Sequence, residues 1–181
     1  MSEPLNYLNL RERIQDGDIV FVARSKGIAG KITELVTRSP FYHVGIAFWM
    51  RDSSYESRLF IVEAHQGGRR IISLSSYAAH PLTVVKSEVP FLSYSSDLIA
   101  QTGSVPYGYM DFLAIGLWEV LKIKARDFSG EVCSEMVALS LNMGGLYLPR
   151  HISPGALFTR LVSQMDWKIR LTTDADSKEN T

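Results

Sequence analysis

The sequence has 181 residues, of which 46% are hydrophobic and 21% are charged. These values are typical of a globular protein rather than a disordered or fibrous one. Lys and Arg together number 19, as do Asp and Glu, so the formal net charge is +0. This balance argues against an overall field that would draw the protein to nucleic acid or to an anionic membrane. We therefore expect no nucleic-acid partner.

The length predicts a single domain over residues 1–171, and the polar composition beyond it predicts a disordered C-terminal tail over residues 172–181. The chain has one cysteine, so no intramolecular disulfide is expected. The first residues lack the basic start and apolar run of a signal peptide. The best apolar stretch, 112–120, contains Glu119 and is too short to span a bilayer. The prediction is a cytoplasmic protein without a membrane span.

Turn residues and β-branched runs predict short strands in the first half of the chain. Strands are expected at residues 19–23, 42–49, 59–64, 70–74 and 82–86, and a helix is expected at 27–38. In the second strand, alternation places Val44, Ile46 and Phe48 on one face and His43, Gly45 and Ala47 on the other. Strands that follow one another this closely predict an antiparallel sheet.

After Pro90 the pattern becomes helical. Helices are expected at residues 95–102, 109–122, 131–143 and 154–165, with a short strand at 167–171. The Gly144-Gly145 pair predicts a left-handed end for the third of these helices. The predicted fold class is α+β, with an antiparallel sheet packed against helices.

Cys133 is expected in the first turn of the helix at 131–143. Backbone N–H groups and the helix dipole favour a thiolate there, and the same N–H groups can stabilise an oxyanion. Two observations favour a structural role instead. Free cysteine is usually buried as a small hydrophobe. Glu131 and Glu135 would oppose thiolate formation if they pointed inward.

His43 and Glu63 are the candidate partners of this thiol. A thiol nucleophile needs an imidazole to form an ion pair with the thiolate and to protonate the leaving group. Glu63 lies in an apolar strand, where a carboxylate is costly unless it is paired. If its strand neighbours that of His43, Glu63 orients the imidazole, although His65 or Gln66 could take that role.

Five short segments in this order resemble the circularly permuted branch of the NlpC/P60 papain-like superfamily, in particular the YiiX/YebB-like cysteine hydrolases. The segments are Gly17-Asp18-Ile19-Val20, His43-Val44-Gly45-Ile46, Val62-Glu63-Ala64, Tyr107-Gly108-Tyr109 and Val132-Cys133-Ser134-Glu135. In that branch the histidine precedes the cysteine, as it does here. The resemblance extends from about residue 17 to about residue 158.

The resemblance implies a papain-like fold in which Cys133 is the nucleophile, His43 the general base and acid, and Glu63 the residue that orients His43. It also implies that Tyr107 and Tyr109 lie near the substrate cleft, although both are equally suited to packing. The implied activity is a cysteine hydrolase of the peptidase or amidase type, or a thioester or ester hydrolase, acting through an acyl-enzyme. Substrates in the family are peptides, peptidoglycan-like molecules or acyl lipids.

Three alternatives remain open at this stage. The fold could carry an acyltransferase, in which another nucleophile replaces water. It could be a binding module in which Cys133 is unreactive. A zinc site from His43, Glu63, His65 and Cys133 has suitable ligand types, but no metal-binding spacing supports it. We therefore expect neither a metal nor another cofactor.

Overall fold

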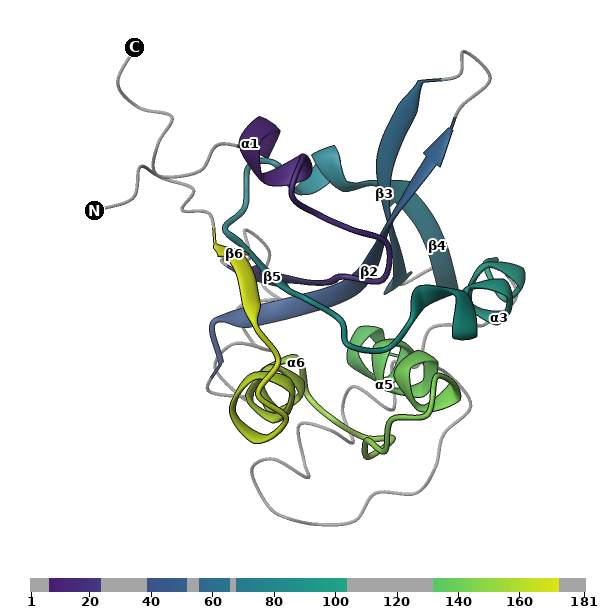
Figure 1. Cartoon of the computed structure of the whole chain (residues 1–181), viewed down its shortest axis with the longest axis vertical. Helices are drawn as coiled ribbons and strands as arrows, with labels where there is room; N and C mark the ends of the chain where they lie inside the picture. Colours follow the sequence, from purple (N-terminus) through teal and green to yellow (C-terminus); the bar gives the residue numbers. More distant parts are fainter. Residues whose placement is uncertain (1–6, 24–38, 52–55, 66–67, 104–131, 173–181) are drawn as a thin grey trace.

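The computed structural model describes residues 7–23, 39–51, 56–65, 68–103 and 132–172. These residues form a six-stranded antiparallel sheet with the order β4-β3-β2-β1-β5-β6 (Figure 1). Its strands are β1 (Ile19–Ala23), β2 (Phe41–Arg51), β3 (Ser57–His65), β4 (Gly68–Ser73), β5 (Leu82–Val85) and β6 (Ile169–Thr172). All five strands predicted in the first half of the chain are confirmed to within a few residues.

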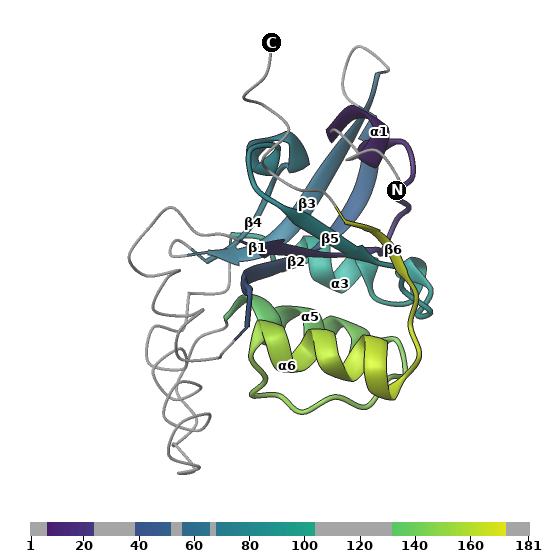
Figure 2. The ribbon, with the colours of Figure 1, turned by 90° about the vertical axis from the view of Figure 1, so that its left-hand side faces the viewer.

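The helical elements of the described residues lie on both sides of this sheet. They are α1 (Tyr7–Arg11), η1 (Leu74–Tyr77), η2 (Phe91–Ser93), α3 (Ser95–Ala100), α5 (Cys133–Met143), α6 (Pro154–Thr159) and the π-helical η3 (Arg160–Gln164). Figure 2 shows α5 and α6 on one side of the sheet and α1 on the other. The predicted α+β class is confirmed, and the arrangement is consistent with a papain-like fold.

Two predicted helices, 27–38 and 109–122, lie outside the described residues. Of the tail predicted at 172–181, Thr172 is the last residue of β6, and residues 173–181 lie outside the described residues. The predicted left-handed helix end is confirmed one residue after the α5 C-cap, because Gly145 has φ +97°. The short strand predicted at 167–171 is confirmed as β6, which begins two residues later and ends one residue later. β6 follows η3 and pairs antiparallel with β5, so the chain returns to the edge of the sheet. No helix of the described ranges is long and apolar enough to cross a membrane.

Alternation along the strands produces two cores, as period-two patterning requires. The larger core fills the space between the sheet and α3, α5 and α6, and it includes Val44, Ile46, Phe48 and Cys133. The smaller core lies on the other face, and it includes Leu10 of α1, Leu74 of η1, Ala47 and Ile61. The predicted division of the β2 side chains between two faces is therefore confirmed. His43 and Glu63 share the face of the smaller core by their position in each strand.

Gly45 allows β3 to approach β2 closely near the end of their pairing. A Cβ atom at Gly45 would lie 2.6 Å from the Ile61 side chain and 2.7 Å from the Val62 carbonyl oxygen. The Ile61 side chain and the Val62 carbonyl oxygen therefore occupy the space beside Gly45. The β2–β3 register pairs Arg51 with Ser57 and continues to Ile46 with Val62. His43 and Glu63 lie just beyond this last pair.

Candidate active site

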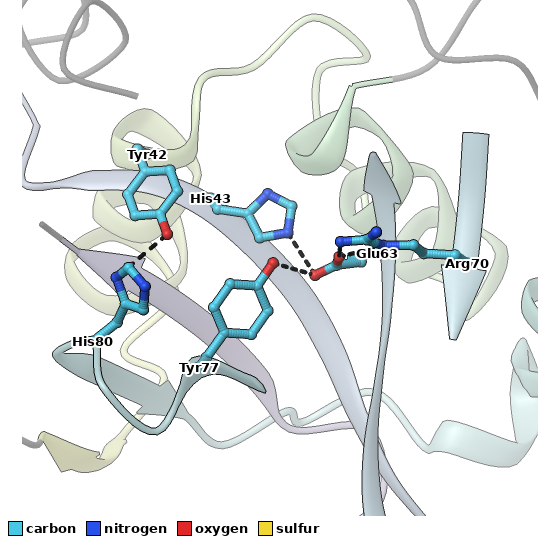
Figure 3. Close-up of polar contacts among 6 residues, drawn as sticks. All are labelled: Tyr42, His43, Glu63, Arg70, Tyr77 and His80. Atoms are coloured by element: carbon cyan, nitrogen blue, oxygen red, sulfur yellow. Dashed lines mark hydrogen bonds and ion pairs between the residues drawn. The ribbon is translucent and has the colours of Figure 1, made fainter. Parts of the chain in front are cut away.

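His43 and Glu63 form a direct contact within the sheet. The Nε2 atom of His43 lies 2.7 Å from Oε2 of Glu63 (Figure 3). The side chain of His43 is 10% exposed and that of Glu63 is 0% exposed. A buried carboxylate is tolerated only when hydrogen bonds and opposite charge replace its lost hydration. His43 therefore provides a buried partner for Glu63, as expected for a carboxylate in an apolar strand.

Arg70 and Tyr77 complete the surroundings of the Glu63 carboxylate. Arg70 places Nε at 2.8 Å and Nη2 at 2.7 Å from Oε1. The Tyr77 hydroxyl donates to Oε2 at 2.7 Å, so Oε2 also serves His43 (Figure 3). Each carboxylate oxygen thus has two donor atoms close to it. This arrangement fixes the plane of the carboxylate and holds it in the ionised form.

The charges of these groups reinforce one another. Burial alone would raise the pKa of the Glu63 carboxyl, but the hydrogen bond and charge of His43, together with the hydrogen bonds from Tyr77 and Arg70, lower it from 4.5 to about 2. Burial and the adjacent carboxylate raise the pKa of Tyr77 far above its ordinary value. The Tyr77 hydroxyl consequently remains protonated and acts as a donor.

Cys133 is the first residue of α5 and is 7% exposed. Burial alone would lower the pKa of His43, but attraction to Cys133 and a hydrogen bond with it, together with the hydrogen bond and attraction to Glu63, raise it from 6.5 to about 10. The imidazole therefore interacts with both the thiol and the carboxylate. Cys133 belongs to the core on the helical face of the sheet.

The contacts of His43 assign different tasks to its two ring nitrogens. Nε2 faces the ionised carboxylate of Glu63, which can only accept a hydrogen bond. Nε2 therefore carries a proton in the neutral ring, and Nδ1 is the nitrogen left to exchange a proton with Cys133. A carboxylate that holds an imidazole in one tautomer is the arrangement found in catalytic triads.

Glu135 follows Cys133 by two residues and is 1% exposed. Its Oε1 atom contacts Nδ1 of His151, and its Oε2 atom accepts a hydrogen bond from the Val132 N–H at 3.4 Å. The sequence analysis identified an inward-pointing Glu135 as an obstacle to a thiolate. The carboxylate does point inward, but a histidine and a helix N–H group are in contact with it. Glu131 lies outside the described residues.

Of the five predicted site residues, the structure thus brings three together, namely Cys133, His43 and Glu63. Tyr107 and Tyr109 lie outside the described residues, as does Gln66. His65 ends β3, and its pKa is lowered by burial and by the charge of Arg70. Of the candidates for orienting His43 that the structure describes, Glu63 makes the contact with Nε2.

Arg70 and Tyr77 are site residues that the sequence pattern did not predict. The β3–β4 hairpin pairs His65 with Gly68 and therefore Glu63 with Arg70. Opposite charges at these two positions were a signal for the pair, because opposite charges on facing strand residues attract. Tyr77 comes from η1, which sequence spacing did not predict.

Two further rings, those of Tyr42 and His80, extend the site. The Tyr42 hydroxyl lies 3.5 Å from Nδ1 of His80 (Figure 3). The ring centroids of His43 and Tyr77 are 5.7 Å apart, and those of Tyr42 and His43 are 6.2 Å apart. These distances are typical of packed aromatic side chains. Tyr42 and His80 are partly exposed, and the group of rings packs beside the His43 imidazole.

Among the residues that the structure describes, no three His, Cys, Asp or Glu side chains converge as metal ligands would.

No protein-family model matches the chain, and no curated protein matches it. Among solved structures the chain is similar to the metalloprotein yiiX from Escherichia coli O157:H7, with 18% identity, 89% of this chain and 87% of that chain covered, and a TM-score of 0.44.

Proposed function

We propose that the protein is a cysteine-dependent hydrolase that forms an acyl-enzyme on Cys133, with His43 as general base and acid. The observation that carries the proposal is the position of the His43 imidazole, which interacts with Cys133 while its Nε2 atom is held at 2.7 Å from the buried Glu63 carboxylate. A structural cysteine needs no such partner, whereas a thiol nucleophile does.

In this scheme the proton of Cys133 passes to Nδ1 of His43, and the thiolate attacks the carbonyl carbon of an amide, thioester or ester. Backbone N–H groups at the start of α5 stabilise the oxyanion of the tetrahedral intermediate. His43 then gives its proton to the leaving amine, thiol or alcohol, and a thioester to Cys133 remains. Water attacks this thioester while His43 accepts a proton, which releases a carboxylic acid and the free thiol.

Glu63 does not take a proton in the scheme. It keeps Nε2 as the donor nitrogen and stabilises the imidazolium form of His43. Arg70 and Tyr77 hold the carboxylate in place from its other sides. Because Arg70 offsets part of the charge of Glu63, the imidazolium is more acidic than it would be beside an isolated carboxylate. This favours release of its proton to the leaving group.

The substrate classes follow from the resemblance to permuted NlpC/P60 proteins. A peptide, a peptidoglycan-like molecule or an acyl lipid supplies the carbonyl group. An acyltransferase would use the same acyl-enzyme and differ only in the acceptor. A binding module with an inert thiol is the alternative from another class. The pairing of Glu135 with His151 favours the enzyme, because it offsets the charge that would oppose a thiolate.

The rate of Cys133 alkylation by iodoacetamide between pH 4 and pH 10 tests the proposal. The chain has one cysteine, so the product is unambiguous in a mass spectrum. We expect the native thiol to react well below pH 8.5, the ordinary pKa of a free thiol being about that value. His43→Ala should abolish the reactivity at low pH. His80→Ala is the matched control, because His80 contacts Tyr42 in the same group of rings.

If the native thiol titrates as an ordinary thiol and His43→Ala leaves its profile unchanged, the binding module replaces the enzyme. If the pair is present, incubation with activated esters and amides follows. A mass increase equal to the acyl group on Cys133, absent in Cys133→Ser, identifies the acyl-enzyme. Its decay in water, compared with its decay in the presence of an added amine or alcohol, separates hydrolysis from acyl transfer.

A further inference from the structure

A second carboxylate–histidine pair, in which the carboxylate is buried and the histidine is partly exposed, lies beside the nucleophile, and the proposed chemistry does not use it. Glu135 is 1% exposed and the side chain of His151 is 35% exposed. Glu135 contacts His151 through Oε1 and holds the N–H of Val132 through Oε2. Val132 immediately precedes Cys133 in the sequence. Glu135 thus joins the start of α5 to the segment between α5 and α6.

That segment is attached to α5 at two further points. Ser134, the neighbour of Cys133, donates its hydroxyl to the Ile152 carbonyl oxygen at 2.5 Å. At the other end of α5, the Asn142 side chain donates to the Leu148 carbonyl oxygen at 2.9 Å and accepts from the Leu148 N–H at 2.7 Å. The segment from residue 148 to residue 152 is therefore fixed along the length of the helix.

The same segment continues into α6, whose first turn touches the residues that lead into β2. Ser153 caps α6 by accepting a hydrogen bond from the Ala156 N–H at 3.3 Å. A Cβ atom at Gly155 would lie 2.3 Å from Cβ and 2.4 Å from Oγ of Ser39. Ser39 Oγ in turn accepts from the N–H of Phe41, the first residue of β2, at 3.1 Å. His43 follows two residues later.

Residues 150–155 thus form a continuous link from the helix end that carries Cys133 to the strand that carries His43, which we call the bracket. We propose that the bracket sets the separation of the Cys133 thiol and the His43 imidazole, and that Glu135 and His151 are positioning residues for this pair. The inference rests on the proposed function. Its physical basis is that proton exchange between thiol and imidazole needs hydrogen-bond distance, so a displacement of about 1 Å is costly.

Gly155→Ala tests the bracket mechanically. The new methyl group collides with Ser39, so α6 and the start of β2 must move apart. We expect the alkylation rate of Cys133 at pH 6 to fall about tenfold or more, by the sensitivity of aligned groups to displacement. Ser39→Gly removes both atoms that the methyl group would meet. The double variant Gly155→Ala with Ser39→Gly should therefore recover most of the rate relative to Ser39→Gly alone.

Glu135→Gln tests the positioning role by the direction of its effect. If Glu135 acted only through its charge, its removal would favour the thiolate and speed alkylation at pH 6. If it positions the helix end, loss of the ion pair with His151 should slow alkylation and move the pH profile toward that of an ordinary thiol. Glu135→Asp, which keeps the charge but shortens the side chain, should also slow alkylation.

Thermal unfolding of each variant, measured alongside, shows that the comparison uses folded protein. Faster alkylation in Glu135→Gln would overturn the positioning role, and so would a native pH profile in a folded Gly155→Ala variant. The alkylation profile of the unsubstituted protein distinguishes a failure of the proposed function from a failure of the bracket proposal. If its thiol reacts below pH 8.5 and loses that reactivity in His43→Ala, the proposed function stands whatever the bracket variants show.

Discussion

His43 and Glu63 are twenty positions apart in the sequence, and their side chains meet at 2.7 Å just beyond the last paired residues of β2 and β3. The contact depends on the position of each residue in its own strand, because both side chains must project from the same face of the sheet. Its burial makes the carboxylate and the imidazole mutually dependent. Loss of either group would leave the other without one of its buried partners.

Glu63→Gln should lower the free energy of unfolding and slow the alkylation of Cys133. The amide keeps the shape of the side chain, but it has no charge to pair with Arg70, and an NH2 donor replaces one of the two oxygens that accept from His43, Tyr77 and Arg70. We expect a loss of stability of about 1–3 kcal/mol, measured by urea unfolding. Alkylation of Cys133 at pH 6 should fall in the same variant. Unchanged stability and an unchanged rate together would contradict the role given to Glu63.

The stability of the protein should depend on pH in two separate windows. The pKa of Glu63 is lowered from 4.5 to about 2 in the fold, so its contribution is complete above pH 4.5 and is lost as the pH falls toward 2. The pKa of His43 is raised from 6.5 to about 10, so its contribution is complete below pH 6.5 and is lost as the pH rises toward 10.

The combined contribution of Glu63 and His43 to the free energy of unfolding should therefore be greatest between pH 4.5 and pH 6.5. The check is urea unfolding at half-unit steps from pH 3 to pH 10. Glu63→Gln should flatten the acid side relative to the unsubstituted protein, and His43→Ala should flatten the alkaline side. Identical pH slopes in the variants and the unsubstituted protein would show that other groups control the profile.

Tyr77→Phe removes one of the donors to Oε2 of Glu63 and leaves the ring in place. Because the acceptor is a buried carboxylate, the expected cost is about 1.5–3 kcal/mol, the range for hydrogen bonds to charged groups. The control is Tyr42→Phe, whose hydroxyl lies next to His80 rather than Glu63. Denaturant unfolding of both variants gives the comparison. An equal cost for the two would argue against a special role for the Tyr77 hydroxyl.

Gly45→Ala should destabilise the sheet by about 1–3 kcal/mol, the usual cost of overpacking. The added methyl group meets both the Ile61 side chain and the Val62 carbonyl oxygen. Ile61→Ala removes both side-chain atoms that the methyl group meets but not the Val62 carbonyl oxygen, so Gly45→Ala combined with Ile61→Ala should remain destabilised relative to Ile61→Ala alone. Full recovery in the double variant would show that only the side-chain contact matters.

Much of the fold could be predicted from local pattern. The strand that contains His43 was recognisable because apolar residues alternate with small and polar ones, and a half-buried strand requires that alternation. The start of α5 followed from the residues around Cys133. The short elements α1, η1 and η2 were not predicted, because three to five residues carry too little periodicity to distinguish a helical turn from a loop.

The sequence by itself determined the residue types available for a thiol site and the face of β2 on which His43 lies. Only the tertiary structure decided that Glu63 is the residue paired with His43, and that Arg70, Tyr77 and His151 take part in the electrostatics around the site. The reason is physical. Strand pattern specifies which face a side chain occupies, whereas the partner across strands and between layers depends on register and on how the chain returns. The contact of Glu135 with His151 arises in this way, since residues sixteen positions apart meet only when the segment after α5 folds back against its first turn.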